Sequence, residues 1–217
     1  MKVFFASAAP IDLALGWSDG MWEEKRERIA CMRRDTDKAL ALTAHRLLCY
    51  ALKTVCGFIP HPADFMLEPK GKPYLKSMPD VHFSISHSGG MAMCALHDSP
   101  VGADIERRRS VGAGVAERIM TAEEFRLYSD TPDRQQLFFQ IWTLKEAFVK
   151  YRGSGLGMSM SSFHAYPSVN GGVATDTGCE FWIGQPAPGY QAAVCANNGT
   201  PPQLLTVDAR QLSQIIV

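Results

Sequence analysis

The chain has 217 residues, of which 46% are hydrophobic and 20% charged, and its 22 basic and 22 acidic side chains give a formal net charge of zero. These proportions are typical of a globular protein with enough apolar material for one large domain or two small ones. The zero net charge argues against a nucleic-acid binder that works through a basic surface, so a phosphate site has to come from a local cluster of cations.

The cysteines and the hydropathy favour a cytoplasmic protein without a membrane anchor. Six cysteines are scattered along the chain and form no Cys-x-x-Cys pair, which is more typical of a reduced intracellular protein than of three disulfides. The apolar stretch of residues 1–9 ends at Pro10 and is short for a signal peptide, so we expect a first strand there. No segment reaches the roughly 20 apolar residues needed to span a bilayer.

The first half of the chain predicts a strand, two helices and then a series of strands. The first strand covers residues 2–8, and the charged segment 22–34 is helical in character. Asp37 is the expected N-cap of a second helix that runs to about Val55 and ends at Gly57. A loop, a short strand near residues 65–68 and the segment 71–75 follow. Residues 81–86, 91–96 and 101–106 are then expected to form an antiparallel meander with turns at residues 89–90 and 97–100.

The second half predicts helices followed by strands. Helices are expected at residues 115–120 and 122–129, the latter begun by a Thr121/Glu124 capping box, and at residues 135–150, ended by Gly153. Strands are expected near residues 180–183, 190–196 and 204–207. Both halves therefore predict an α+β fold of two similar lobes, residues 1–99 and 100–217, in which antiparallel strands pack with helices, although no residue-level repeat is visible.

Two carboxylates, Asp104 and Glu106, lie on one face of the third meander strand because side chains alternate along a strand. Hard oxygen ligands in such a pair suit Mg²⁺, which binds one or two carboxylates together with substrate phosphates. Gly102 lies on the same face and would let a bulky ligand approach closely. The alternative is a pair of solvated surface acids.

Trp142, Glu146 and Lys150 form a stripe along the predicted helix 135–150, since residues four apart share a helix face. In a functional site Glu146 would complete a metal site of three carboxylates, and Lys145 and Lys150 would meet phosphate oxygens. The alternative is an ordinary surface ion pair between Glu146 and Lys150, which contributes little.

Two turns could also present polar groups to an anion. The segment Ser86-His87-Ser88-Gly89-Gly90 offers hydroxyls, an imidazole and backbone amides, and Lys72-Pro73 offers a lysine beside a rigid ring. Each segment by itself is equally compatible with a plain polar turn.

Taken together, four segments resemble the successive signatures of the 4′-phosphopantetheinyl transferases. They are Gly71-Lys-Pro-Tyr-Leu75, Phe83-Ser-Ile-Ser-His-Ser88, Gly102-Ala-Asp-Ile-Glu106 and Trp142-Thr-Leu-Lys-Glu-Ala-Phe-Val-Lys150. The length and spacing resemble the Sfp-type branch of that family, a single-chain pseudo-dimer of two α+β lobes related by pseudo-twofold symmetry.

This resemblance implies transfer of the phosphopantetheine arm of coenzyme A to a serine of an apo acyl or peptidyl carrier protein, with Mg²⁺, or Mn²⁺, as the metal. It implies that Asp104, Glu106 and Glu146 hold the metal, and that Glu146 is the general base, acting directly or through water. Lys72 and Pro73 would border the adenine, Ser86 and His87 would contact the 3′-phosphate, and Lys150 the pyrophosphate. The family also has an arginine in the second helix, for which Lys38 or Arg46 could substitute; Lys25 and Arg28 are further candidates.

Carrier proteins are acidic around their modified serine, so the resemblance also implies a basic docking face, for which Arg107, Arg108, Arg109 and Arg118 are candidates. A solvated basic turn is the alternative. We expect a cytoplasmic monomer that binds neither nucleic acid nor membrane. A noncatalytic coenzyme A or nucleotide-binding module and a metal-dependent phosphohydrolase are the competing functions.

Overall fold

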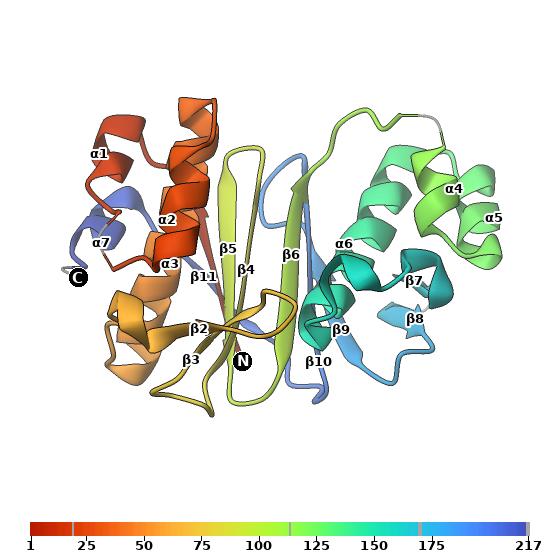
Figure 1. Ribbon diagram of the computed structural model, residues 1–217. Helices are drawn as coiled ribbons and strands as arrows, with labels where there is room; N and C mark the ends of the chain where they lie inside the picture. Colours follow the sequence, from red (N-terminus) through yellow and green to blue (C-terminus); the bar gives the residue numbers. More distant parts are fainter. Residues whose placement is uncertain (19, 113, 169–170, 216–217) are drawn as a thin grey trace.

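The computed structural model describes residues 1–18, 20–112, 114–168 and 171–215 of the chain (Figure 1). Its first part contains three α-helices and five strands. The helices are α1 (Ile11–Leu15), α2 (Glu23–Ala30) and α3 (Asp35–Cys56). The strands are β1 (Lys2–Ser7), β2 (Phe65–Leu67), β3 (Pro73–Leu75), β4 (His82–Ser88) and β5 (Met91–His97).

The second part contains four α-helices and six strands. The helices are α4 (Val115–Ile119), α5 (Ala122–Asp130), α6 (Arg134–Arg152) and α7 (Ala209–Ser213). The strands are β6 (Val101–Arg107), β7 (Ala165–Pro167), β8 (Val173–Thr175), β9 (Glu180–Gly184), β10 (Tyr190–Ala196) and β11 (Gln203–Thr206). Short 3₁₀ turns span Pro62–Asp64, Gly155–Gly157 and Met160–Ser162.

The two parts repeat one topology, which confirms the predicted α+β fold of two similar lobes. The first sheet has the order β1-β5-β4 and the second the order β6-β10-β9, each with its own long helix, α3 or α6, and its own two-stranded hairpin, β2-β3 or β7-β8. The lobe division at residues 99 and 100 stays a prediction; that point falls in the turn between β5 and β6. The sequence did not indicate that β11 returns to pair in parallel with β1, beside the first lobe.

The elements stack as helix, sheet, sheet and helix, with the strands in the middle of Figure 1 and the helices on either side. Alternation along each strand explains the layers. In β1, Phe4 packs in the cluster that contains α3, whereas Val3 packs against Ile105 and Val194 of the second sheet. On the far face of that second sheet, Ala193 packs against α6. The two sheets therefore bury a common core between them.

Two local predictions are wrong. The segment 81–106 is not a continuous meander, because β6 pairs with β10 of the second sheet, and not with β5. Asp37 is not an N-cap: α3 already begins at Asp35, and its N-cap residue, Arg34, makes no side-chain cap. The predicted ends are confirmed at Gly57 and Gly153, whose φ angles of 66° and 60° suit the left-handed residue that closes a helix.

All six cysteines lie within the described residues and are free thiols, with Cys49, Cys94 and Cys195 buried. Among the described residues, no helix is long and apolar enough to cross a membrane.

Candidate functional site

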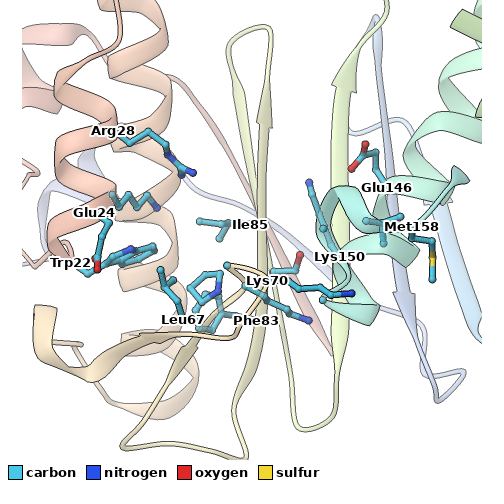
Figure 2. Close-up of a pocket in the computed structure, with 18 of the residues that line it drawn as sticks. Trp22, Glu24, Arg28, Leu67, Lys70, Phe83, Ile85, Glu146, Lys150 and Met158 are labelled. Atoms are coloured by element: carbon cyan, nitrogen blue, oxygen red, sulfur yellow. The ribbon is translucent and has the colours of Figure 1, made fainter.

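A cavity of about 630 Å³ lies between the two lobes (Figure 2). Its first wall comes from α2, the β2-β3 hairpin and β4, and its second wall from α6 and the turns that follow it. Figure 2 shows Trp22 and Arg28 on the side of α2, Glu146 and Lys150 on the side of α6, and Ile85 of β4 between them. We call this space the larger cavity.

A second cavity, of about 360 Å³, adjoins the first and is called the smaller cavity. Five residues line both spaces, so the two form one continuous cleft; these are Lys25, Arg28, Ile85, Glu146 and Lys150. The smaller cavity adds the proposed carboxylates Asp104 and Glu106, together with Ser86, His87 and Trp142. The predicted stripe of Trp142, Glu146 and Lys150 on one helix face is confirmed, since all three line this cavity.

The wall of the smaller cavity contains an ion pair held by a serine of the other lobe. The Nζ atom of Lys150 lies 2.6 Å from Oδ1 of Asp104 and donates to Oγ of Ser86 at 2.9 Å. Ser86 in turn donates to the same Asp104 oxygen at 2.7 Å. Strands β4 and β6 and helix α6 therefore meet at one carboxylate oxygen.

Gly102 explains how α6 comes so close to β6. A methyl group at this position would overlap the carbonyl oxygen of Ala147 and the backbone nitrogen of Tyr151. The expectation that Gly102 admits a bulky ligand is therefore wrong, because the backbone of α6 occupies that space. The bare glycine instead lets the helix carry Glu146 and Lys150 up to the carboxylates of β6.

Burial and mutual repulsion disfavour the charged forms of the carboxylates in the site, and a bound cation would favour them. Burial raises the pKa of Asp104, against the opposing effect of Lys150, and burial together with Asp104 raises the pKa of Glu146. Within the described part of the chain, the buried Oδ2 of Asp104 has no hydrogen-bond partner. A second cation beside Asp104 would reduce the repulsion between Asp104 and Glu146 and would give Oδ2 of Asp104 a partner.

The described residues do not include a group of three or more His, Cys, Asp or Glu side chains already arranged to hold a metal ion. The assignment of Asp104, Glu106 and Glu146 as metal ligands therefore stays a prediction. It is supported by their shared cavity and by the chemistry of three carboxylates, which suits Mg²⁺.

The two predicted turns are placed differently from each other. Ser86 is buried and engaged with Asp104 and Lys150, so in this structure its hydroxyl is turned to the carboxylate. His87 is exposed and lines the smaller cavity, where partial desolvation of the ring and the charges of Lys25 and Lys150 lower its pKa. Its imidazole is therefore neutral at pH 7 in the absence of an anion.

Lys72 and Pro73 both line the larger cavity. The Nζ atom of Lys72 donates to the backbone carbonyls of Val101 and Tyr151, each at 3.3 Å, and burial lowers its pKa. Lys72 therefore ties the β2-β3 hairpin of the first lobe to β6 and α6 of the second, in addition to lining the wall beside Pro73.

The structure shows which of the candidate basic residues of the first lobe line the cleft and which do not. Lys38 does not line either cavity and pairs with Asp35 at 3.8 Å. Arg46 donates to the backbone carbonyls of Leu212 and Ile215 and so anchors the C-terminal segment.

Lys25 and Arg28 line both cavities instead. Lys25 is only 5% exposed, its Nζ lies 4.8 Å from the Trp22 ring centroid, and within the described residues that Nζ has no hydrogen-bond partner. Burial lowers its pKa to about 7. A buried, unpaired amine that lines a cavity indicates an anionic ligand. The sequence carried only a weak signal for it, a lysine in a charged helix three residues after a tryptophan.

Lys145 does not reach the cleft, which corrects its predicted role at phosphate oxygens. Its Nζ is fully buried, pairs with Glu124 at 2.6 Å and donates to the carbonyls of Met160 and Phe163 at 2.6 and 2.7 Å. Glu124 also accepts from the amide of Thr121 in the predicted capping box, which is confirmed. The pair fastens α5 and the segment after α6 to the core.

Two arginines of the basic turn after β6 make contacts within the protein. Arg108 donates to Gln136 of α6 at 3.2 Å, and Arg109 donates to Oε2 of Glu106 at 3.1 Å and lies over the Phe139 ring. This turn therefore borders the smaller cavity through Glu106, and its role in docking a partner stays a prediction.

Comparisons with known proteins identify the family of the chain. The family model of the 4′-phosphopantetheinyl transferase superfamily matches residues 100–195, the range that contains Asp104, Glu106, Glu146 and Lys150. The 4′-phosphopantetheinyl transferase psf-1 of Bacillus pumilus is 38% identical over 179 residues, which cover 79% of this chain and 77% of that protein. The 4′-phosphopantetheinyl transferase Sfp of Bacillus subtilis is 32% identical over 150 residues, which cover 66% and 67% respectively.

Among solved structures, the holo-[acyl-carrier-protein] synthase of Thermotoga maritima matches 44% of this chain and 61% of its own, with 26% identity and a TM-score of 0.39. The sequence relationships to psf-1 and Sfp extend over most of both chains. The chain therefore belongs to the 4′-phosphopantetheinyl transferase superfamily and is of the Sfp type.

Proposed function

We propose that this protein transfers the 4′-phosphopantetheine group of coenzyme A to a serine hydroxyl of an apo acyl or peptidyl carrier protein and releases adenosine 3′,5′-bisphosphate. The observation that carries the proposal is the cleft between the lobes, where Lys150, Asp104 and Glu146 meet beside two further cations, Lys25 and Arg28. The relatives Sfp and psf-1 are both 4′-phosphopantetheinyl transferases by name, which supports this reaction.

The cleft offers separate surroundings for the phosphates and the adenine of coenzyme A. Lys25, Arg28 and Lys150 are the cations for its phosphates, and the unpaired Nζ of Lys25 is the strongest sign of an anion among them. Lys72 and Pro73 would border the adenine. In this proposal His87, at the rim, joins the 3′-phosphate, and Ser86 serves that phosphate only if its bond to Asp104 rearranges. Lys38 is not part of the proposed site.

The reaction forms a bond between the carrier serine oxygen and the phosphorus that bears pantetheine, and breaks the bond from that phosphorus to the bridging pyrophosphate oxygen. The serine proton passes to Glu146, directly or through a water, while the electron pair of the broken bond leaves on the adenosine bisphosphate. Glu146 lines the cavity beside Lys150 and Asp104, where a carboxylate can accept this proton. Lys150 stabilises the charge that spreads over the phosphoryl oxygens.

Asp104, Glu106 and Glu146 would hold Mg²⁺, or Mn²⁺, in this proposal. The buried, unpartnered Oδ2 of Asp104 and the raised pKa values of Asp104 and Glu146 fit a divalent cation. When bound, such an ion neutralises pyrophosphate charge and orients its oxygens. The ligand oxygens are supplied by one strand and one helix, so the packing of α6 on β6 decides their spacing.

The carrier protein would approach the open side of the smaller cavity, next to the basic turn of Arg107, Arg108 and Arg109 and to Arg118. Acidic residues around the carrier serine complement such a surface. A monomer in the cytoplasm that binds neither membrane nor nucleic acid remains part of the proposal.

The test is to incubate the protein with an apo carrier protein, coenzyme A and Mg²⁺ and to record the intact mass of the carrier. The proposal expects a gain of one phosphopantetheine, and no gain with any of several acyl and peptidyl carriers would overturn it. Cleavage of coenzyme A without a carrier would indicate a phosphohydrolase, and binding alone would indicate a noncatalytic module. A Glu146→Gln variant should lose about 10²–10⁴-fold in rate, and Glu117→Gln, an exposed glutamate of α4, is the matched control.

A further inference from the structure

Three serines project from one face of β4 at every second position and reach β6. We call the boundary between β4 and β6 the seam. Ser84 accepts from the backbone amide of Ala103 at 2.9 Å, and Ser86 donates to Asp104. Ser88 donates to Oε2 of Glu106 at 2.5 Å. Strands β4 and β6 belong to different sheets and share no backbone ladder, so these hydroxyls replace the missing ladder. Two of the three end on carboxylates of the proposed metal site.

Ser88 is doubly engaged and shares its carboxylate oxygen with a cation. Its Oγ also accepts from the backbone amide of Arg107 at 3.2 Å, which fixes the direction in which the hydroxyl proton points. The same Oε2 of Glu106 accepts from Arg109 at 3.1 Å. Glu106 is 19% exposed and Arg109 is 65% exposed at their side chains, so the serine bond is the more shielded of the two.

We propose that Ser88 is a positioning residue that holds the Glu106 carboxylate, from the opposite lobe, in the orientation needed to bind the divalent metal, and that Arg109 competes with the metal for the same oxygen. This inference rests on the proposed function. A hydroxyl that donates to one carboxylate oxygen orients the group without cancelling its charge, as outer partners of metal ligands do. A guanidinium on that oxygen both orients it and opposes the cation.

The two partners of one oxygen should therefore have opposite effects when they are removed. Ser88→Ala frees the carboxylate to swing toward Arg109 and should weaken metal binding by about tenfold, the lower end of the effect of such outer partners. Arg109→Ala removes a competing charge from an exposed position and should strengthen metal binding by roughly two- to threefold. General loosening of the seam would weaken binding in both variants.

The experiment measures Mn²⁺ binding to the intact protein in the presence of coenzyme A, from the electron paramagnetic resonance signal of free Mn²⁺. The proposal expects a dissociation constant about tenfold higher for Ser88→Ala, restored by Ser88→Thr, and a lower constant for Arg109→Ala. In a Glu106→Gln background the Ser88→Ala effect should vanish, since the carboxylate is no longer there to be oriented.

Ser84→Ala is the comparison variant, because it removes a seam hydrogen bond of the same strand that ends on a backbone amide; Ser84 also lines the larger cavity, so it is assayed at saturating coenzyme A. Its Mn²⁺ dissociation constant should stay within a factor of two, whatever it does to the midpoint of urea unfolding. If the unaltered protein binds Mn²⁺ and Ser88→Ala binds it equally well, or if Arg109→Ala weakens binding, this inference alone is wrong. If the unaltered protein fails to bind Mn²⁺ with coenzyme A present, the metal role in the proposed function fails with it.

Discussion

The ammonium of Lys150 lies 2.6 Å from Oδ1 of Asp104 and so joins α6 to the edge strand β6 in the wall of the cleft. Ser86 of the first lobe forms hydrogen bonds with both Lys150 and Asp104 and so connects that lobe to the ion pair. The lysine is 30% exposed, whereas the aspartate is only 5% exposed. The carboxylate is therefore fixed in the protein, and the ammonium is the partner with room to turn toward a phosphate.

Replacing Lys150 by alanine should lower kcat for carrier modification by about 10²–10³-fold, the usual effect of removing one group that stabilises transition-state charge. The measurement is steady-state transfer to an apo carrier, followed by intact mass or a labelled coenzyme A. Lys53→Ala, at an exposed lysine near the end of α3, should leave kcat unchanged. Equal rates for the two variants would contradict the role given to Lys150.

Coenzyme A binding should take up a proton above pH 7, because burial lowers the pKa of Lys25 to about 7. The positive charge of Arg28 lowers it further. The amine is therefore mostly neutral at pH 8 in the free protein and becomes charged beside a bound phosphate. Affinity should fall by up to about tenfold per pH unit as pH rises above 7.

Calorimetry at pH 8 in buffers of different ionisation enthalpy measures this proton directly. Lys25→Met should abolish the uptake and flatten the dependence of affinity on pH above 7. Lys38→Met, at a lysine outside both cavities, should keep both effects. A binding heat that is independent of the buffer in the unaltered protein would contradict this account.

Lys145 should matter for stability more than for chemistry. It and Glu124 are both fully buried, so Lys145→Met leaves an uncompensated buried carboxylate and should cost about 3–5 kcal/mol of unfolding free energy in urea titrations. The double variant Lys145→Met/Glu124→Gln should cost clearly less than the sum of the single changes.

The surface pair of Arg26 with Glu23 provides the comparison for that measurement. Both side chains are more than half exposed, and Arg26→Met should change the unfolding free energy by less than about 1 kcal/mol. Additive costs for the double variant at Lys145 and Glu124 would show that the buried pair does not act as a unit.

Gly102→Ala should push α6 away from β6 and damage both stability and activity. The added methyl would overlap backbone atoms of α6, which cannot rotate away as a side chain can, so a cost of about 1–3 kcal/mol or more is expected. The shift also displaces Glu146 and Lys150, so kcat should fall as well. Gly112→Ala, where an added methyl meets nothing within 4 Å, should be neutral in urea unfolding and in transfer assays.

Local patterns in the sequence were sufficient for most elements and for the outline of the site. The alternation of side chains along a strand placed Asp104 and Glu106 on one face. A spacing of four residues placed Trp142, Glu146 and Lys150 on one helix face. These relationships depend only on the backbone geometry of a single element, which a short stretch of sequence determines.

Partner choice between elements was decided by the tertiary structure. Strand β6 follows β5 closely and reads as its neighbour, yet it pairs with β10, because each sheet completes its own lobe and the two sheets share an apolar core. Likewise, nothing local showed that the space above Gly102 holds a helix or that Lys25 is buried without a partner.

The two lysines of α6 show which properties the local sequence determines and which ones tertiary packing decides. Positions 145 and 150 are five residues apart, or about 140° around a helix, so Lys145 shares the face of Ile141 and Phe148 while Lys150 shares that of Glu146. Helix geometry sends the two ammonium groups in different directions, although we expected both at phosphate oxygens from the sequence. Only the packing decided that one meets Glu124 in the core and the other meets Asp104 in the cleft, because burial and pairing depend on residues far away in the chain.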